Sequence, residues 1–142
     1  MPGRWHNEME AAFPKTLREV KFFCSSLVGY TCRRADILLS HSKTVEIQHS
    51  HISSNEIVAR FNDWNKFGKE IIWLVDGNSG VMYSKLSTGN YLLKINDTWK
   101  YDSFKSKYEF ILLAWGDKIF KIELKKIKCK MIELKEYKSK EE

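Results

Sequence analysis

Two short apolar segments in the first half of the chain each carry one acidic residue at their centre. Asp36 lies within residues 34–39 and Glu46 within residues 44–50. A carboxylate in a buried strand costs several kcal/mol unless a partner or a metal compensates it. The polar residues 40–43 between the segments are typical of a hairpin turn. A turn centred on residues 41 and 42 would place Asp36 opposite Glu46.

This opposed pair of acids predicts a cation site. Directly opposed residues of antiparallel strands have Cβ atoms about 5 Å apart, so like charges repel there. Gln48 follows Glu46 by two residues and projects from the same face of the strand. Two carboxylates and an amide suit a hard divalent cation, which prefers oxygen ligands. In the alternative interpretation, arginines neutralise the two acids; the candidates are Arg33, Arg34 and Arg60.

Length and composition are those of one globular domain. The 142 residues suffice to bury roughly two-thirds of the unfolded surface. The chain is 43% hydrophobic and 13% aromatic, which argues against disorder. We therefore expect a single domain over residues 1–142. It comprises a core (1–77), a β-rich extension (78–137) and a frayed tail (138–142).

Charge and cysteine content bear on partners and compartment. The net charge of +6 favours a polyanionic partner, although a solvated lysine face explains it equally well. The three cysteines match neither a disulfide framework nor a paired zinc motif. The sequence has no membrane-spanning run and no signal-peptide pattern. These features predict an intracellular protein of the cytoplasm or nucleus, in a reducing compartment, that is neither secreted nor bound to a membrane.

Hydrophobic periodicity predicts the element order of the first half. A capping box at Ser53 and Glu56 begins a helix, and Gly68 ends it. Its apolar stripe is formed by Ile57, Phe61 and Trp64. The other predicted elements are a helix over 3–13, strands over 17–23, 30–39 and 44–49, and a buried strand over 71–75. The order is thus α-β-β-β-α-β.

The second half has shorter, antiparallel patterns. The expected strands cover residues 81–86, 91–95, 110–115, 118–124 and 126–134. The fold class is therefore α/β (α+β), an α-β-β-β-α-β core with a C-terminal antiparallel β-rich extension.

A set of residues in the first half carries a family resemblance. They are Trp5, His6, Phe13, Pro14, Glu19, Ala35, Asp36, Glu46, Gln48, Ser50, Ile52, Glu56, Arg60 and residues 73–77. With an acid in the second strand and an acid-x-amide in the third, the chain resembles the restriction-endonuclease-like superfamily, whose motif is PD-(D/E)XK. Within it, the chain is most similar to the CoiA-like competence nucleases. The usual lysine of the superfamily is Gln48 here.

The resemblance implies a Mg²⁺-dependent DNA endonuclease or resolvase-like nuclease acting in DNA repair, recombination or processing. Asp36, Glu46 and the backbone carbonyl of Ile47 would hold Mg²⁺, with Mn²⁺ as a substitute. Gln48 would orient the attacking water. One alternative is a catalytically weak or inactive DNA-binding or assembly module on the same scaffold. Another is a protein-interaction module with a basic surface.

Further residues are candidates for the same site. His6, on the first helix, would lie near the metal or the phosphate. Glu10, one turn further, and Glu19, on the first strand, are alternative acids. The cations expected to contact DNA are Arg34, Arg60, Lys66 and Lys69. The DNA would be branched or flapped, and a homodimer would supply two sites for two strands.

Two open alternatives concern single residues. Arg60 follows Glu56 by four residues and equally suits an ion pair on the helix surface. His49 and His51 lie on one strand face, but a zinc site would require a third protein ligand.

Overall fold

The computed structural model describes residues 4–23, 31–49, 52–77, 81–95, 101–116, 118–127 and 131–137. The chain divides into two compact units, Met1–Trp73 and Leu74–Glu142. The histidine His51 and the tail predicted over 138–142 lie outside the described residues. Within the described part, no helix has the length and apolar character needed to cross a membrane.

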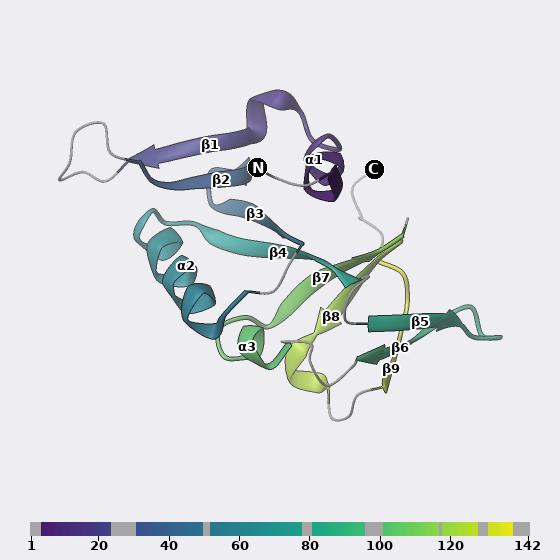
Figure 1. Cartoon of the computed structure of the whole chain (residues 1–142). Helices are drawn as coiled ribbons and strands as arrows, with labels where there is room; N and C mark the ends of the chain where they lie inside the picture. Colours follow the sequence, from purple (N-terminus) through teal and green to yellow (C-terminus); the bar gives the residue numbers. More distant parts are fainter. Residues whose placement is uncertain are drawn as a thin grey trace. The chain divides into compact units, whose positions relative to one another are not determined.

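The first unit follows the predicted order of elements. Its elements are α1 (Arg4–Glu10), the 3-10 turn η1 (Lys15–Leu17), β1 (Arg18–Phe23), β2 (Thr31–Ser40), β3 (Lys43–Gln48), α2 (Ser54–Lys66) and the first part of β4 (Glu70–Asp76). Neighbouring strands run in the order β1-β2-β3-β4, and β2 is antiparallel to both β1 and β3. Figure 1 shows α1 beside β1 and β2, with α2 alongside β3 and β4.

The β2–β3 hairpin has the register expected from its turn. Ser40 pairs with Lys43 across the turn, and Ile37 pairs with Val45. Continued by one residue, this register puts Asp36 opposite Glu46. On β2, Ala35 and Ile37 are fully buried, whereas Asp36 between them is half-buried. Because successive side chains of a strand point to opposite faces, Asp36 points away from the face that carries Ala35 and Ile37.

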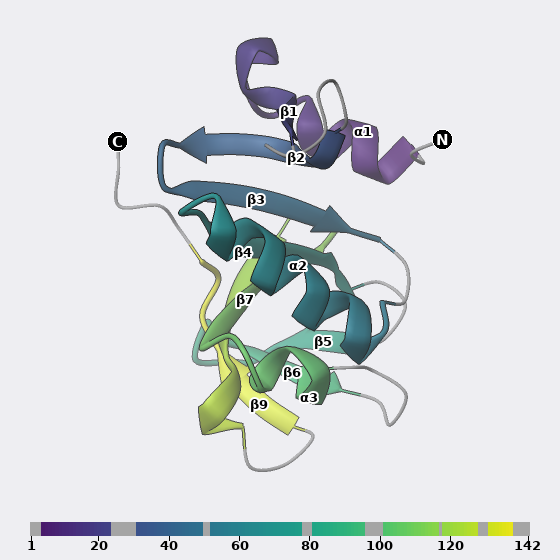
Figure 2. The same cartoon turned by 90° about the vertical axis from the view of Figure 1, so that its left-hand side faces the viewer.

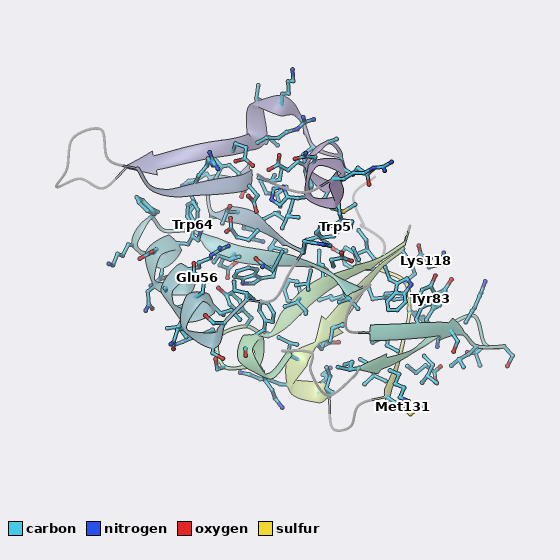
Figure 3. All side chains as sticks on the ribbon, in the orientation of Figure 1. Trp5, Glu56, Trp64, Tyr83, Lys118 and Met131 are labelled. Atoms are coloured by element: carbon cyan, nitrogen blue, oxygen red, sulfur yellow. The ribbon has the colours of Figure 1, made fainter. Side chains whose placement is uncertain are left out.

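Helix α2 begins and ends at the predicted residues. The Ser53 hydroxyl accepts a hydrogen bond from the Glu56 backbone N–H at 3.1 Å, which caps the first turn. Ile57 and Trp64 are fully buried on one face, and Gly68 adopts a φ of +71° just after the helix. Figure 2 shows α2 running along β3 and β4, and Figure 3 labels Glu56 and Trp64 on this helix.

Helix α1 is shorter than predicted. It ends at Glu10, and residues up to Phe13 continue as turns. Pro14 disfavours a helical conformation at the residue before it, so the prediction of a helix to residue 13 was wrong at this end. The early end leaves the carbonyls of Ala11 and Phe13 available to a side chain from β1.

The second unit contains the rest of β4 and the β-rich part. Strand β4 pairs in parallel with β7 (Phe110–Trp115), which is antiparallel to β8 (Lys118–Glu123). A separate antiparallel sheet has the order β5-β6-β9, from Val81–Lys85, Tyr91–Ile95 and Met131–Leu134. A Cβ at Gly77 would lie 2.9 Å from Leu113 Cγ, so only glycine allows the chain to pass β7 this closely.

Two elements of this unit differ from the expectation. The strand predicted over 126–134 does not begin at Lys126, because Leu124–Lys126 form the 3-10 turn η3; residues 128–130 lie outside the described part, and β9 is Met131–Leu134. Buried Leu124 and Ile127 are three residues apart, a turn spacing rather than strand alternation. The five-residue helix α3 (Tyr101–Lys105) is too short for its periodicity to be recognised.

Aromatic residues pack in the interior of the second unit. Tyr91 and Phe120 are buried with ring centroids 5.3 Å apart, and Tyr83 packs edge-on against Trp115 at 5.1 Å. Figure 3 labels Tyr83, together with Lys118, whose ammonium lies 5.6 Å from the Tyr91 ring centroid. Few helices and a predominance of strands make the fold α+β.

Candidate metal centre

Asp36 and Glu46 are linked through the backbone of the hairpin. Asp36 Oδ2 accepts a hydrogen bond from the Ile47 backbone N–H at 2.8 Å. The Asp36 backbone N–H points to Glu46 Oε2 at 3.4 Å. Each acid thus receives an N–H from the opposite strand, and both carboxylates are fixed by the hairpin. Asp36 also contacts His6 of α1, whereas Glu46 contacts Arg60 of α2.

Asp36 lies in a cluster with residues from α1 and β1. Among the described residues, ligand atoms of His6, Glu10, Glu19 and Asp36 all lie within 4.8 Å of one another. His6 Nε2 is 3.3 Å from Asp36 Oδ1, and His6 Nδ1 is 3.8 Å from Glu10 Oε2. His6 and Glu10 are four residues apart and therefore share one face of α1. We call these four residues the Asp36 cluster.

Two carboxyls of the Asp36 cluster have raised pKa values, chiefly because they are buried. Burial, a hydrogen bond with Glu19 and the charges of Glu19 and Asp36 raise the pKa of Glu10 to about 8. Burial likewise raises the pKa of Asp36, although the Ile47 N–H and His6 oppose the shift. At neutral pH the Glu10 carboxyl therefore keeps a proton. A bound cation would remove the reason for this proton.

The donor set fits a divalent cation. Glu10 is only 9% exposed, and its Oε2 atom is buried without a hydrogen-bond partner. His6 Nδ1 is also buried without one. Three carboxylates and one imidazole are a ligand set that suits Mn²⁺ and related ions, while the carboxylates alone suit Mg²⁺. A cation here would satisfy both buried atoms.

Glu46 is neutralised by an arginine of α2. Its Oε1 atom lies 3.1 Å from Arg60 Nη1, and the residue is 4% exposed. Arg60 Nε also pairs with Glu56 Oε2 at 2.8 Å, and the guanidinium lies over the Trp73 ring at 5.7 Å. Two of the sequence interpretations of Arg60, neutralising Glu46 and pairing with Glu56, are both found in the structure, and its contact with DNA stays a prediction.

Glu19 is held in an uncommon backbone conformation. Its φ is +53°, in the left-handed region that non-glycine residues rarely adopt. The residue lies between Arg18, which pairs with Ile37, and Val20, which pairs with Ala35. Its side chain reaches the Asp36 cluster and also pairs with Arg34, whose Nε lies 2.8 Å from Glu19 Oε1. Strained backbone of this kind is frequent at functional sites.

The other predicted site residues do not belong to the Asp36 cluster, although the Ile47 N–H donates to Asp36. Gln48 ends β3 and is half-buried. Ile47 is 4% exposed. Lys69 Nζ donates to the His41 carbonyl at 2.6 Å, and Lys66 is exposed in the last turn of α2. His49 is exposed, with its ring 5.6 Å from that of Trp5; its predicted partner His51 lies outside the described residues.

The sequence predicted all four members of the Asp36 cluster as candidates for one site. It gave Glu10 and Glu19 only as alternative acids, because their nearness to Asp36 depends on the turn after α1. It did not identify Arg18, which contacts that turn. A lone arginine at the start of a strand gives no signal in one sequence.

The α+β fold is consistent with a nuclease-like protein. Residues 26–134 match the family model described as competence protein CoiA, nuclease-like domain. The chain therefore belongs to the CoiA nuclease-like family. The matched range contains Asp36 and Glu46 but begins after His6, Glu10 and Glu19. Comparisons with curated proteins and with solved structures gave no match.

Proposed function

We propose that this protein is a metal-dependent DNA endonuclease whose cation binds at the Asp36 cluster. The observation that carries the proposal is the gathering of three carboxylates and one imidazole within 4.8 Å in a chain of a nuclease-like family. Mg²⁺ is the expected physiological ion. Mn²⁺ should bind at least as tightly, because imidazole nitrogen suits a transition metal better than Mg²⁺.

The roles of the residues follow from their contacts. His6, Glu10, Glu19 and Asp36 would hold the cation. The cation would polarise the scissile phosphate and lower the pKa of a bound water. Glu46 lies next to Asp36 through the Asp36 backbone N–H, and the proposal keeps it as the second catalytic acid of the hairpin. Gln48 would orient the water through its amide, which both donates and accepts hydrogen bonds.

Basic residues of the same unit would contact the DNA backbone. Arg34 has a side chain that is 55% exposed and a contact to Glu19 at the cluster, so it can reach a phosphate close to the cation. Lys66 and Lys69 would add charge along α2 and the turn after it. Arg60 would contact DNA only by giving up one of its two acidic partners. Branched or flapped substrates and a homodimer with two centres complete the proposal.

The test uses purified protein with linear, nicked, flapped and branched DNA. Mg²⁺ or Mn²⁺ should support cleavage, and EDTA should abolish it. Asp36→Asn and Glu46→Gln should both remove the activity, while Glu8→Gln should retain it, because Glu8 is an exposed acid of α1 paired with Arg4. Equal cleavage by wild type and Asp36→Asn would contradict the proposal and indicate a contaminating nuclease.

A second candidate is a DNA-binding module without turnover. Two observations favour it: an uncharged amide, Gln48, replaces the usual lysine, and Arg60 already neutralises Glu46. Gln48 would contribute less to stabilising charge in the transition state than a lysine. This candidate predicts DNA binding that weakens steeply with salt and no cleavage with either metal.

A further inference from the structure

The guanidinium of Arg18 spans the turn that joins α1 to β1. Arg18 Nε donates to the Phe13 carbonyl at 2.8 Å, and Nη2 donates to the same oxygen at 2.6 Å. Nη2 also reaches the Ala11 carbonyl at 3.4 Å. Both carbonyls lie in the turn that follows Glu10, the last residue of α1. A cation at this end also suits the helix dipole.

One further hydrogen bond connects this contact to Glu10. The Phe13 backbone N–H donates to the Glu10 carbonyl at 3.0 Å. The peptide groups on the two sides of Phe13 are therefore both held, one by Glu10 and one by Arg18. Any movement of the turn would shift the end of α1, and with it the Glu10 carboxyl.

The other side of Arg18 leads directly to Glu19. Arg18 begins β1 and pairs with Ile37 of β2, next to Asp36. Its neighbour Glu19 turns towards the Asp36 cluster through the backbone conformation with φ +53°. Arg18 thus lies on β1, which carries Glu19, and its side chain holds the turn after α1, which carries Glu10.

We propose that Arg18 is a positioning residue for the cation centre. It holds the Glu10 carboxylate of α1 close enough to those of Glu19 and Asp36, within 4.8 Å, for the three to share one cation. This inference rests on the proposed function, because it assumes a cation at the Asp36 cluster. It concerns a residue outside the range matched by the family model. Arg18 does not touch the cation itself; it acts through the turn and the end of α1.

Arg18 can affect the cation centre in two ways, through its positive charge and through the two N–H groups that hold the Phe13 carbonyl. The charge lowers the pKa of Glu10 in part, against burial and the neighbouring acids. Lysine would keep the charge but has no planar fork to hold one carbonyl with two N–H groups. Methionine would keep the length of the side chain and remove both. The two substitutions therefore separate position from charge.

The experiment measures Mn²⁺ affinity by isothermal titration calorimetry for wild type, Arg18→Met, Arg18→Lys and Arg4→Met. Arg18→Met should bind Mn²⁺ about 10- to 100-fold more weakly, the usual effect of losing an outer-shell partner. Arg18→Lys should fall between Arg18→Met and wild type. Arg4→Met is the matched control, because Arg4 is an arginine of α1 that is 91% exposed and pairs with Glu8. It should bind like wild type.

A double-mutant cycle distinguishes positioning from a general loss of structure. If Arg18 acts through Glu10, Arg18→Met should weaken Mn²⁺ binding much less in a Glu10→Gln background than in wild type. A structural effect elsewhere would weaken both backgrounds equally and overturn the inference. If Arg18→Met does not unfold cooperatively in urea, Arg18→Lys replaces it in the same cycle.

Failure of this inference is distinguishable from failure of the proposed function. Tight binding by wild type with equal binding by Arg18→Met would overturn the role of Arg18 and leave the centre intact. Absence of Mn²⁺ binding by wild type would overturn the centre, and the role of Arg18 with it. Wild-type affinity in Arg18→Lys would show that charge alone matters and would also overturn the positioning role.

Discussion

Asp36 and Glu46 face each other across one hairpin, yet their surroundings are opposite. Asp36 meets a histidine and two further acids from α1 and β1, and its pKa and that of Glu10 are raised. Glu46 meets Arg60 from α2, which neutralises it at 3.1 Å. The first acid therefore lies among carboxyls whose pKa values are raised, whereas the second is paired with an arginine.

The difference indicates at which of the two acids a cation would bind more favourably. A cation at the Asp36 cluster would replace a proton and relieve repulsion among carboxylates. A cation at Glu46 would first have to compete with a guanidinium already in place. Opposed acids in a hairpin therefore do not share one environment, and the helix packed on each acid decides which of them is available to a metal.

The largest expected effect is the loss of cleavage in Asp36→Asn. Asp36 is a member of the cluster, and its carboxylate accepts a hydrogen bond from the Ile47 N–H. Replacing this carboxylate with the amide of asparagine should lower the rate of DNA cleavage by about 100-fold or more. The rate of product formation with saturating Mn²⁺ on a gel measures this. A cleavage rate as high as that of the Glu8→Gln control would contradict this prediction, because the Asp36 cluster would then have no part in catalysis.

The next effect concerns stability on the Glu46 side. Arg60→Met removes the guanidinium that pairs with Glu46, which is only 4% exposed. This loss should lower the free energy of unfolding by about 2 kcal/mol. The effect is smaller than for a fully buried pair because Arg60 is partly exposed. Urea unfolding measures it. The double variant Glu46→Gln with Arg60→Met should be more stable than Arg60→Met alone. Equal stability of the two would show that the pair does not neutralise Glu46.

The pH dependence of stability sharpens the contrast from the Asp36 side. Glu10 has a pKa of about 8 in the folded protein against 4.5 ordinarily, so the folded state binds more protons between these values. The metal-free protein should therefore lose stability as the pH rises from about 4.5 to 8. Urea midpoints measured across this range should fall less steeply in Glu10→Gln. Parallel curves for the two proteins would contradict the raised pKa.

Added cation should act in the opposite direction. Mn²⁺ takes the place of the Glu10 proton, so its affinity should increase with pH until Glu10 is ionised at about pH 8. Calorimetric titrations at several pH values measure this increase. An affinity that is independent of pH in wild type would place the ion away from Glu10.

The smallest expected effect separates the two regions. Ser53→Ala removes the cap of α2, the helix that carries Arg60, and should cost about 1 kcal/mol of stability. Mn²⁺ affinity at the Asp36 cluster should stay within about twofold of wild type, as for independent sites. Calorimetry and urea unfolding on the same sample test both. A tenfold change in affinity would show that the regions are coupled.

The local features of the first unit could be predicted because each depends on nearby residues. The turn at residues 41 and 42 sets the hairpin register, and Ser53 with Gly68 sets the limits of α2. The likeness to the CoiA-like nucleases, confirmed by the family match, also depends on short motifs. Patterns of this kind are contained in a few consecutive residues.

The environment of the two acids could not be predicted in the same way. The approach of Glu10 and Glu19 depends on the early end of α1, the Arg18 contact and the positive φ of Glu19. Arg60 was a candidate partner for either Glu46 or Glu56, and only the packing of α2 shows that it contacts both. Such contacts join residues distant in sequence and leave no periodic signal.

The location of the cation can be measured in an anomalous diffraction map from a crystal soaked in Mn²⁺. We expect a peak at coordination distance from Asp36 with ligands from His6, Glu10 and Glu19, and no peak there in Asp36→Asn. A peak on Glu46 with Arg60 displaced, or no peak on this hairpin at saturating Mn²⁺, would contradict this expectation.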